Sequence, residues 1–207
     1  MALFTPPAIV RTQVWRLSPK ATIYFPIISG LRNSQVQQLI NHRLQNIIHH
    51  LLVSQGYFQN KDKAEVVSTF EVKNNQRGIL SIAISNYTYI EGAAHGLTVI
   101  QSLTVNTVTG KQYSLLDLFS PNSNYVERIS NEVRAQIRRR EIPTLEPFEN
   151  INPNQYFYIA DKTIVIYFQA YELSPYVVGL PMFPINLFYL QDIAAQGGPI
   201  DILATNS

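Results

Sequence analysis

The sequence of 207 residues predicts an α+β fold, in which two α-helices pack on an antiparallel β-sheet. Apolar residues recur every three or four positions in 36–52 and every four positions in 125–137, the spacing of helices with one buried face. Much of the region between them alternates apolar and polar side chains, which is typical of half-buried strands. Each half of the sequence contains a predicted helix followed by predicted strands. We therefore predict an α+β fold in which the two helices pack on the sheet.

The stretch 87–119 carries the most distinctive pattern. Apolar residues at positions 97, 99, 103 and 105 alternate with Thr, Ser and Asn, which predicts a strand with one buried face. Gly92 and Gly96 bracket a corner before this strand, where the backbone is free to adopt positive φ. Thr109-Gly110 is a turn signal after it.

The first helix is predicted over 33–55. Ser34 and Gln37 have the spacing of a capping box, and Gly56 stands where a helix C-terminal glycine belongs. The opposite face is polar and nearly uncharged. The apolar stripe comprises Val36, Leu39, Ile40, Leu44, Ile47, Ile48, Leu51 and Leu52.

The second helix is predicted to begin at Ser120, with Pro121 at its first helical position, and to run to about Arg140. Pro26 places the strand that contains it at a sheet edge or a strand end. The tail 194–207 is predicted to be flexible. Strands are predicted at 10–15, 21–28, 64–73, 79–89, 97–105, 156–160, 163–168 and 183–190, with hairpin loops at 74–78 and 161–162.

Composition excludes several classes of protein. The net charge is +2, from 16 basic and 14 acidic residues, which is too small to indicate a nucleic-acid partner. The absence of cysteine excludes disulfides and thiolate metal sites, and fits either a reducing cytoplasm or an exported protein that avoids cysteine. Residues 1–10 lack the pattern of a signal peptide, and no apolar run reaches the ~18–20 residues of a membrane span.

Several motifs, taken in order, resemble one family of uncharacterised domains. They are Gly92-Ala93-Ala94-His95-Gly96, Thr109-Gly110-Lys111, Leu115-Leu116-Asp117-Leu118-Phe119 and Tyr171-Glu172-Leu173-Ser174-Pro175-Tyr176 with Gly179, preceded by 26–31 and 40–41. The family is DUF3298, with a DUF4163-like N-terminal half. Its members form the ectodomain of RsiV-like anti-sigma factors and a non-catalytic region of some peptidoglycan deacetylases.

The resemblance implies a DUF4163-like half over 10–110 and a DUF3298-like half over 111–193. It also implies an extracytoplasmic, non-enzymatic module that binds a lysozyme-like protein or a cell-wall glycan, with no cofactor and no metal. The tyrosine- and amide-rich composition suits recognition. The alternatives are an enzyme, or an enzyme's accessory domain, acting on wall polysaccharide, and a purely structural domain. The oligomeric state is not determined by the sequence.

The candidate ligand-binding residues are Tyr89, His95, Tyr171, Glu172 and Tyr176. His95 either contacts a ligand, or serves as a base, or holds its own turn through a bond to the backbone. Glu172 is either a functional carboxylate or a structural hydrogen-bond acceptor. Because their two motifs are the most distinctive, we hypothesise that the corner at 92–96 and the bend at 171–176 lie side by side, with His95 near Glu172 or Tyr171.

No sequence motif indicates catalysis, since phosphate loops, nucleophile elbows and paired metal ligands are all missing. His42, His49 and His50 on the first helix lack the spacing of a metal site without a further element. The one basic cluster either contacts an acidic partner or is a solvated helix end that the helix dipole favours. It comprises Arg134, Arg138, Arg139 and Arg140.

Overall fold

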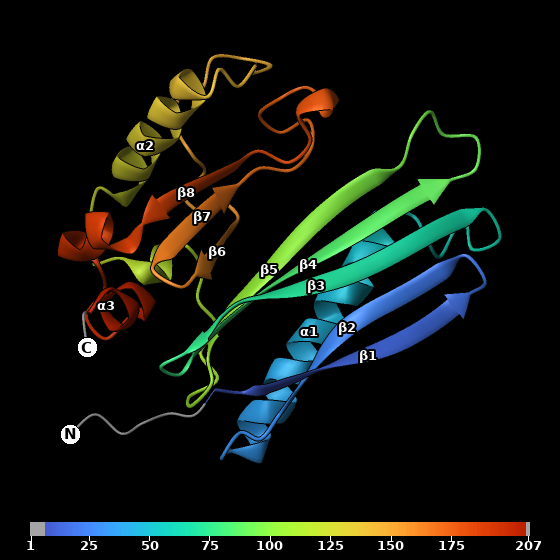
Figure 1. Ribbon diagram of the computed structural model, residues 1–207, viewed down its shortest axis with the longest axis horizontal. Coiled ribbons are helices and arrows are strands. Elements are labelled where there is room, and N and C mark those ends of the chain that lie inside the picture. The colour runs from blue at the N-terminus through green and yellow to red at the C-terminus, as the bar shows by residue number, and fades with distance from the viewer. Residues whose placement is uncertain (1–6, 206–207) are drawn as a thin grey trace. The chain divides into compact units, whose positions relative to one another are not determined.

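A computed structural model describes residues 7–205 and contains two compact units, one ending at Gln112 and the other beginning at Tyr113 (Figure 1). Residues 1–6, part of the stretch 1–10 that lacks a signal-peptide pattern, and residues 206–207, the end of the predicted tail, lie outside the described residues. Each unit has its own sheet and its own helices. The α+β fold class is confirmed, although two sheets replace the single sheet that we predicted.

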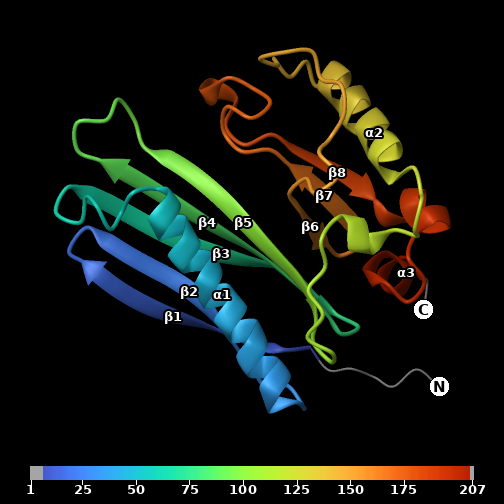
Figure 2. The same cartoon turned by 180° about the vertical axis from the view of Figure 1, so that it is seen from behind.

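The N-terminal unit is a five-stranded sheet in the order β1-β2-β3-β4-β5, with α1 lying across one face (Figure 2). The β2–β3 pair is parallel, with Ala21–Ile23 opposite Val66–Ser68, so the prediction of a purely antiparallel sheet is wrong for this pair. The reason is that α1 connects the two strands and returns the chain to the same end of the sheet. The elements are β1 (Ile9–Ser18), β2 (Ala21–Ser29), α1 (Ser34–Ser54), β3 (Ala64–Gln76), β4 (Ile79–Ile90) and β5 (Leu97–Asn106).

Pro26 shows how the sheet tolerates a proline in its second strand. It pairs with Thr12 of β1, while β3 pairs with β2 only as far as Ile23. On the side of β2 that faces β3, Pro26 therefore lies beyond the paired residues. Its missing N–H costs no hydrogen bond between strands there.

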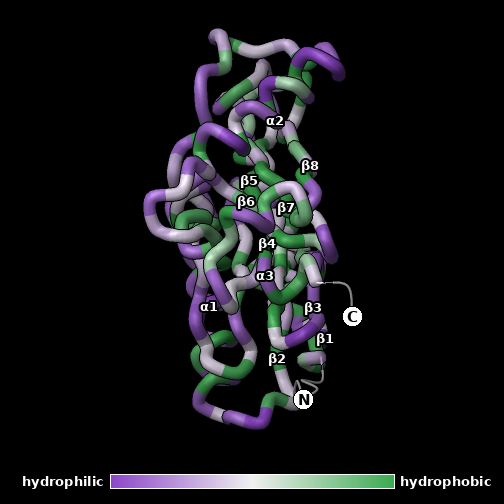
Figure 3. The backbone as a smooth tube through the Cα atoms, turned by 90° about the vertical axis from the view of Figure 1, so that its left-hand side faces the viewer, coloured by the Kyte–Doolittle hydropathy of each residue, from purple (hydrophilic) through white to green (hydrophobic). Residues whose placement is uncertain are grey.

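The core of this unit is the contact between α1 and the sheet. Val36, Ile40, Leu44, Ile48, Leu51 and Leu52 are all buried, and they pack on strand residues that include Ile23, Val66, Ile82 and Leu103. Hydrophobic and polar segments accordingly alternate along α1 (Figure 3). Leu39, which we included in the stripe, is 41% exposed because it lies at the stripe's margin.

The ends of α1 differ in how well they were predicted. The N-cap is Asn33, not Ser34, because the Asn33 side chain accepts hydrogen bonds from the N–H groups of Gln35 and Val36 at 2.9 and 3.2 Å. Gly56 follows the C-cap with φ +74°, which is the role we predicted for it.

The C-terminal unit contains a three-stranded antiparallel sheet in the order β6-β7-β8. Gln136 on α2 donates a 2.8 Å hydrogen bond to the carbonyl of Pro184 on β8. The last strand ends at Asn186, earlier than predicted, because the Asn186 side chain caps a following 3₁₀-helix. The elements are η1 (Leu116–Leu118), α2 (Tyr125–Arg139), β6 (Phe157–Ala160), β7 (Thr163–Tyr167), η2 (Tyr176–Val178), β8 (Met182–Asn186), η3 (Leu187–Ile193) and α3 (Pro199–Ala204).

Two boundaries in this unit correct the sequence predictions. Helix α2 begins at Tyr125 rather than Ser120, because Ser120 bonds through its N–H and hydroxyl to the carbonyls of Ile193 and Ala194. Asn122 also has φ 62°, which a right-handed helix excludes. The segment predicted as a flexible tail instead forms α3, whose side chains at 200 and 203 are buried.

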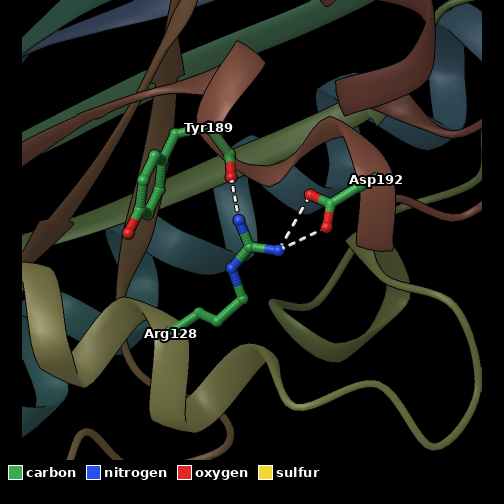
Figure 4. A network of polar contacts seen from close by, with 3 residues as sticks. All are labelled: Arg128, Tyr189 and Asp192. Atoms are coloured by element: carbon green, nitrogen blue, oxygen red, sulfur yellow. Dashed lines mark hydrogen bonds and ion pairs between the residues drawn. The ribbon is translucent and has the colours of Figure 1, made fainter.

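Arg128 joins α2 to the segment that follows β8 (Figure 4). Its guanidinium donates to both carboxylate oxygens of Asp192, at 2.8 and 2.6 Å, and to the carbonyl of Tyr189. The same guanidinium lies 5.1 Å from the centroid of the Tyr189 ring. The hydrogen bond from Arg128, together with its charge, holds the pKa of Asp192 below its ordinary value of 3.8.

We predict that Leu44→Ala lowers the free energy of unfolding by about 2–5 kcal/mol, because it opens a cavity between α1 and the sheet. Denaturant unfolding followed by circular dichroism measures this change. Leu39→Ala on the same helix is the matched control, and its loss should be smaller because Leu39 is 41% exposed. Equal losses would contradict the burial assigned to α1.

We also predict that Asp192→Asn lowers the thermal midpoint at pH 7, and that the difference from the unsubstituted protein closes in acid. Since folding lowers the pKa of Asp192, its stabilisation is present above the ordinary value of 3.8 and is lost as pH falls through the folded value. Calorimetry from pH 7 to pH 2 tests this. Asp161→Asn makes the same chemical change at an exposed hairpin residue and serves as the control for the substitution itself.

Candidate functional site

An open pocket of about 650 Å³ lies in the C-terminal unit, between the start of β6 and the end of β7. Amides and tyrosines dominate its wall, and Glu172 is its one carboxylate. We call it the tyrosine pocket. It is lined by Asn152, Asn154, Gln155, Tyr156, Gln169, Ala170, Tyr171 and Glu172.

Tyr171 is held in a backbone conformation that tyrosine rarely adopts. The N–H of Glu172 donates to the carbonyl of Gln169 at 3.1 Å, which closes a four-residue turn, and Tyr171 occupies its third position with φ 66°. Glycine or asparagine normally takes this position, because a side chain there costs about 1–2 kcal/mol. Strain of this kind concentrates at functional sites, so Tyr171 is a candidate for function.

The carboxylate of Glu172 fixes this turn. One oxygen accepts from the N–H of Gln169 at 2.7 Å, and the other accepts from the side-chain amide of Gln155 at 2.8 Å. The Gln155 amide also donates to the carbonyl of Tyr167 at 3.0 Å. Glu172 therefore acts as an acceptor that ties two loops to the end of β7.

Tyr171 presents its ring outward together with Tyr176. The two rings stack with their centroids 5.6 Å apart and their planes 26° apart, and they are 51% and 39% exposed. Val177, next in η2, is 89% exposed. Together these side chains form an exposed, largely apolar rim beside the tyrosine pocket.

The opposite wall of the pocket was missed by the sequence reasoning. Tyr156 is 44% exposed and stacks on Tyr167, with 5.5 Å between centroids. The preceding turn is closed by the Asn152 side chain, which accepts from the N–H of Asn154 at 2.9 Å. Asn-Pro-Asn at 152–154 is a turn signal in the sequence, but nothing in it identifies a pocket wall.

Tyr89 and His95 belong to the N-terminal unit and do not line the tyrosine pocket. His95 is exposed, and its ring nitrogen Nδ1 lies 3.1 Å from the carbonyl oxygen of Gly96. A Cβ at Gly96 would lie 2.3 Å from the Tyr87 ring, so only glycine fits there. Gly96 of this motif thus serves the packing of the corner.

The structure brings Tyr171, Glu172 and Tyr176 together, but His95 and Glu172 lie in different units. Their pairing therefore stays a prediction. Both oxygens of Glu172 already accept hydrogen bonds within the C-terminal unit. These bonds are those expected of Glu172 as a structural hydrogen-bond acceptor.

The arginines of α2 hold neighbouring segments. Arg134 donates to Asn131 and to the carbonyl of Glu149, and Arg140 donates to the carbonyl of Met182 at 2.7 Å. Over residues 7–205, no group of three or more His, Asp or Glu side chains is arranged to hold a metal ion. None of the described helices is long and apolar enough to span a membrane.

Two protein-family models match different parts of the chain. Residues 18–98 match the family model described as deacetylase PdaC, and residues 116–187 match the model described as a protein of unknown function, DUF3298. The chain is 27% identical over 176 residues to anti-sigma-V factor RsiV of Bacillus subtilis (strain 168). That alignment covers 77% of this chain, which spans 60% of the length of that relative.

Two solved structures have a similar fold. One is a DUF3298 family member from Bacteroides fragilis, with a TM-score of 0.67 and 15% identity over 99% of each chain. The other is a DUF3298 family protein from Pseudomonas aeruginosa PAO1, with a TM-score of 0.67 and 14% identity over 96% of this chain and 97% of that one. The chain is thus similar to DUF3298 proteins over residues 116–187, to the PdaC model over residues 18–98, and to RsiV at 27% identity.

Proposed function

We propose that this chain is a non-catalytic, extracytoplasmic binding module whose tyrosine pocket recognises a lysozyme-like protein or a cell-wall glycan. The observation that carries the proposal is the strained, exposed Tyr171. A tyrosine at a glycine-type position lowers stability, and backbone strain of this kind clusters at functional sites.

The chemistry of the pocket supports recognition. Tyrosine rings supply apolar surface at a small entropic cost, and side-chain amides both donate and accept hydrogen bonds. Both groups suit a glycan, whose faces are apolar and whose edges carry hydroxyls, and they equally suit a polar protein surface. The exposed rim of Tyr171, Tyr176 and Val177 adds apolar area for contact.

The same pocket offers little for catalysis. Hydrolysis of a glycosidic bond normally requires two carboxyl groups across one groove. Glu172 is the one carboxylate lining the pocket, and its oxygens are engaged by Gln155 and Gln169. The match of residues 18–98 to the PdaC model keeps an accessory role beside a deacetylase as the second candidate.

The extracytoplasmic location rests on similarity to an anti-sigma factor. The chain spans 60% of that relative's length, so the proposal concerns the module represented by this chain. In such a protein, a module outside the cell would sense a ligand and transmit its presence to the rest of the chain.

We predict that Tyr171→Gly and Tyr176→Ala each weaken ligand binding by about tenfold or more, as loss of a central aromatic contact does. Glycine adopts positive φ freely, so Tyr171→Gly keeps the turn while removing the ring. Isothermal titration calorimetry with lysozyme and, separately, with soluble peptidoglycan fragments measures the affinities.

Tyr24→Ala is the matched control, since Tyr24 is 41% exposed on β2 in the other unit. Its affinity should equal that of the unsubstituted protein. Binding that survives both pocket substitutions would move recognition away from the tyrosine pocket. Hydrolysis or deacetylation of the glycan by the purified chain would favour the enzymatic alternative.

A further inference from the structure

The N-terminal unit carries a second pocket, which the proposed function does not use. It has a volume of about 390 Å³, within the ~300–1,000 Å³ range of small-molecule sites. We call it the tryptophan pocket. It lies between β1, α1 and the segment after α1, and it is lined by Trp15, Leu17, Gln45, Asn46, Ile48, His49, Leu52, Tyr57, Phe58 and Lys61.

Buried side chains make part of this pocket rigid. Ile48 and Leu52 of α1, and Tyr57 after it, are 1%, 4% and 2% exposed and belong to the core cluster. Since these residues also pack against the sheet, they cannot move without disturbing the core. The apolar lining is therefore preformed.

Two aromatic rings complete the pocket. Trp15 is half-buried, and its ring centroid lies 3.8 Å from that of Phe25, which is fully buried. Phe58 is 39% exposed, yet its ring contacts those of His49 and Tyr57, each at 5.4 Å between centroids. The rings are thus held in place while part of the Phe58 surface faces solvent.

The charged lining of the pocket is positive only. Lys61 is its one lysine or arginine, and no Asp or Glu lines it. The Lys61 ammonium lies 5.6 Å from the centroid of the Phe58 ring. Within residues 7–205, the Lys61 ammonium makes no ion pair with a carboxylate, so it is available to pair with an anionic ligand.

We infer that the tryptophan pocket binds a small amphipathic anion with an aromatic body. The apolar body lies against Trp15, Leu52 and Phe58, and the anionic group pairs with Lys61. The polar rim of Gln45, Asn46 and His49 is exposed and available for hydrogen bonds to the same anionic group. This site is independent of recognition at the tyrosine pocket.

Trp15 gives a direct test because it is the only tryptophan in the chain. The probe is 8-anilino-1-naphthalenesulfonate, and its uncharged counterpart is N-phenyl-1-naphthylamine, which has the same rings without the sulfonate. Both dyes accept energy from tryptophan, so binding beside Trp15 quenches its emission. We expect saturable quenching with one molecule of the anionic dye per chain.

Matched substitutions separate charge from shape. Lys61→Gln should weaken binding of the anionic dye by about two- to fivefold, the usual effect of one exposed ion pair, and leave the uncharged dye unaffected. Lys63→Gln removes an exposed lysine outside the pocket and should change neither affinity. Phe58→Ala should weaken both dyes.

Absence of Trp15 quenching by the anionic dye would overturn the inference. Equal effects of Lys61→Gln and Lys63→Gln would also overturn it, because general attraction to a basic chain would then explain binding. Circular dichroism of each variant distinguishes loss of the pocket from loss of the fold.

Discussion

The hydrogen bonds of the Glu172 carboxylate are the interaction on which the tyrosine pocket depends. They connect the turn at 169–172 with Gln155, whose amide also reaches the end of β7. The turn places Tyr171 at positive φ. The hydrogen bond from the backbone N–H of Gln169 to a carboxylate is stronger than a hydrogen bond to a neutral acceptor, and it helps to hold the turn. A carboxylate used in this way holds the two loops of the pocket together.

The division into two units gives the chain two separate cores and two chemically different pockets. In the N-terminal unit, α1 packs a continuous apolar stripe on five strands, and the residues at one end of that stripe also line the tryptophan pocket. In the C-terminal unit, the tyrosine pocket is formed by loops at the ends of β6 and β7. Residues of β1 and α1 therefore make up most of the lining of the tryptophan pocket, whereas loop residues line the tyrosine pocket.

The sequence predicts most elements of the fold, because local periodicity and end signals decide them. The stripe of α1 and Gly56 are clear examples. It does not predict the parallel β2–β3 pair, which depends on the path of a connection rather than on any residue in the strands. It also misplaces the start of α2, since the bonds of Ser120 to the segment at 193–194 are long-range.

The candidate site could be predicted only in part. The motif at 171–176 marks one wall through its aromatics, and the rings of Tyr171 and Tyr176 stack in the structure. The opposite wall at 152–156 looks like an ordinary polar turn, and only pairing of β6 with β7 brings the two together. His95 stands out in sequence because it lies between glycines, yet Gly96 is required there by the Tyr87 ring.

We propose that ligands bind at the tyrosine pocket. Chemical-shift mapping by NMR tests it most directly, with isotope-labelled protein titrated with lysozyme and with soluble peptidoglycan fragments. We expect one of these ligands to shift resonances concentrated in 152–156 and 169–179. Shifts confined to other parts of the chain, or none with either ligand at concentrations well above those of a specific complex, would contradict it.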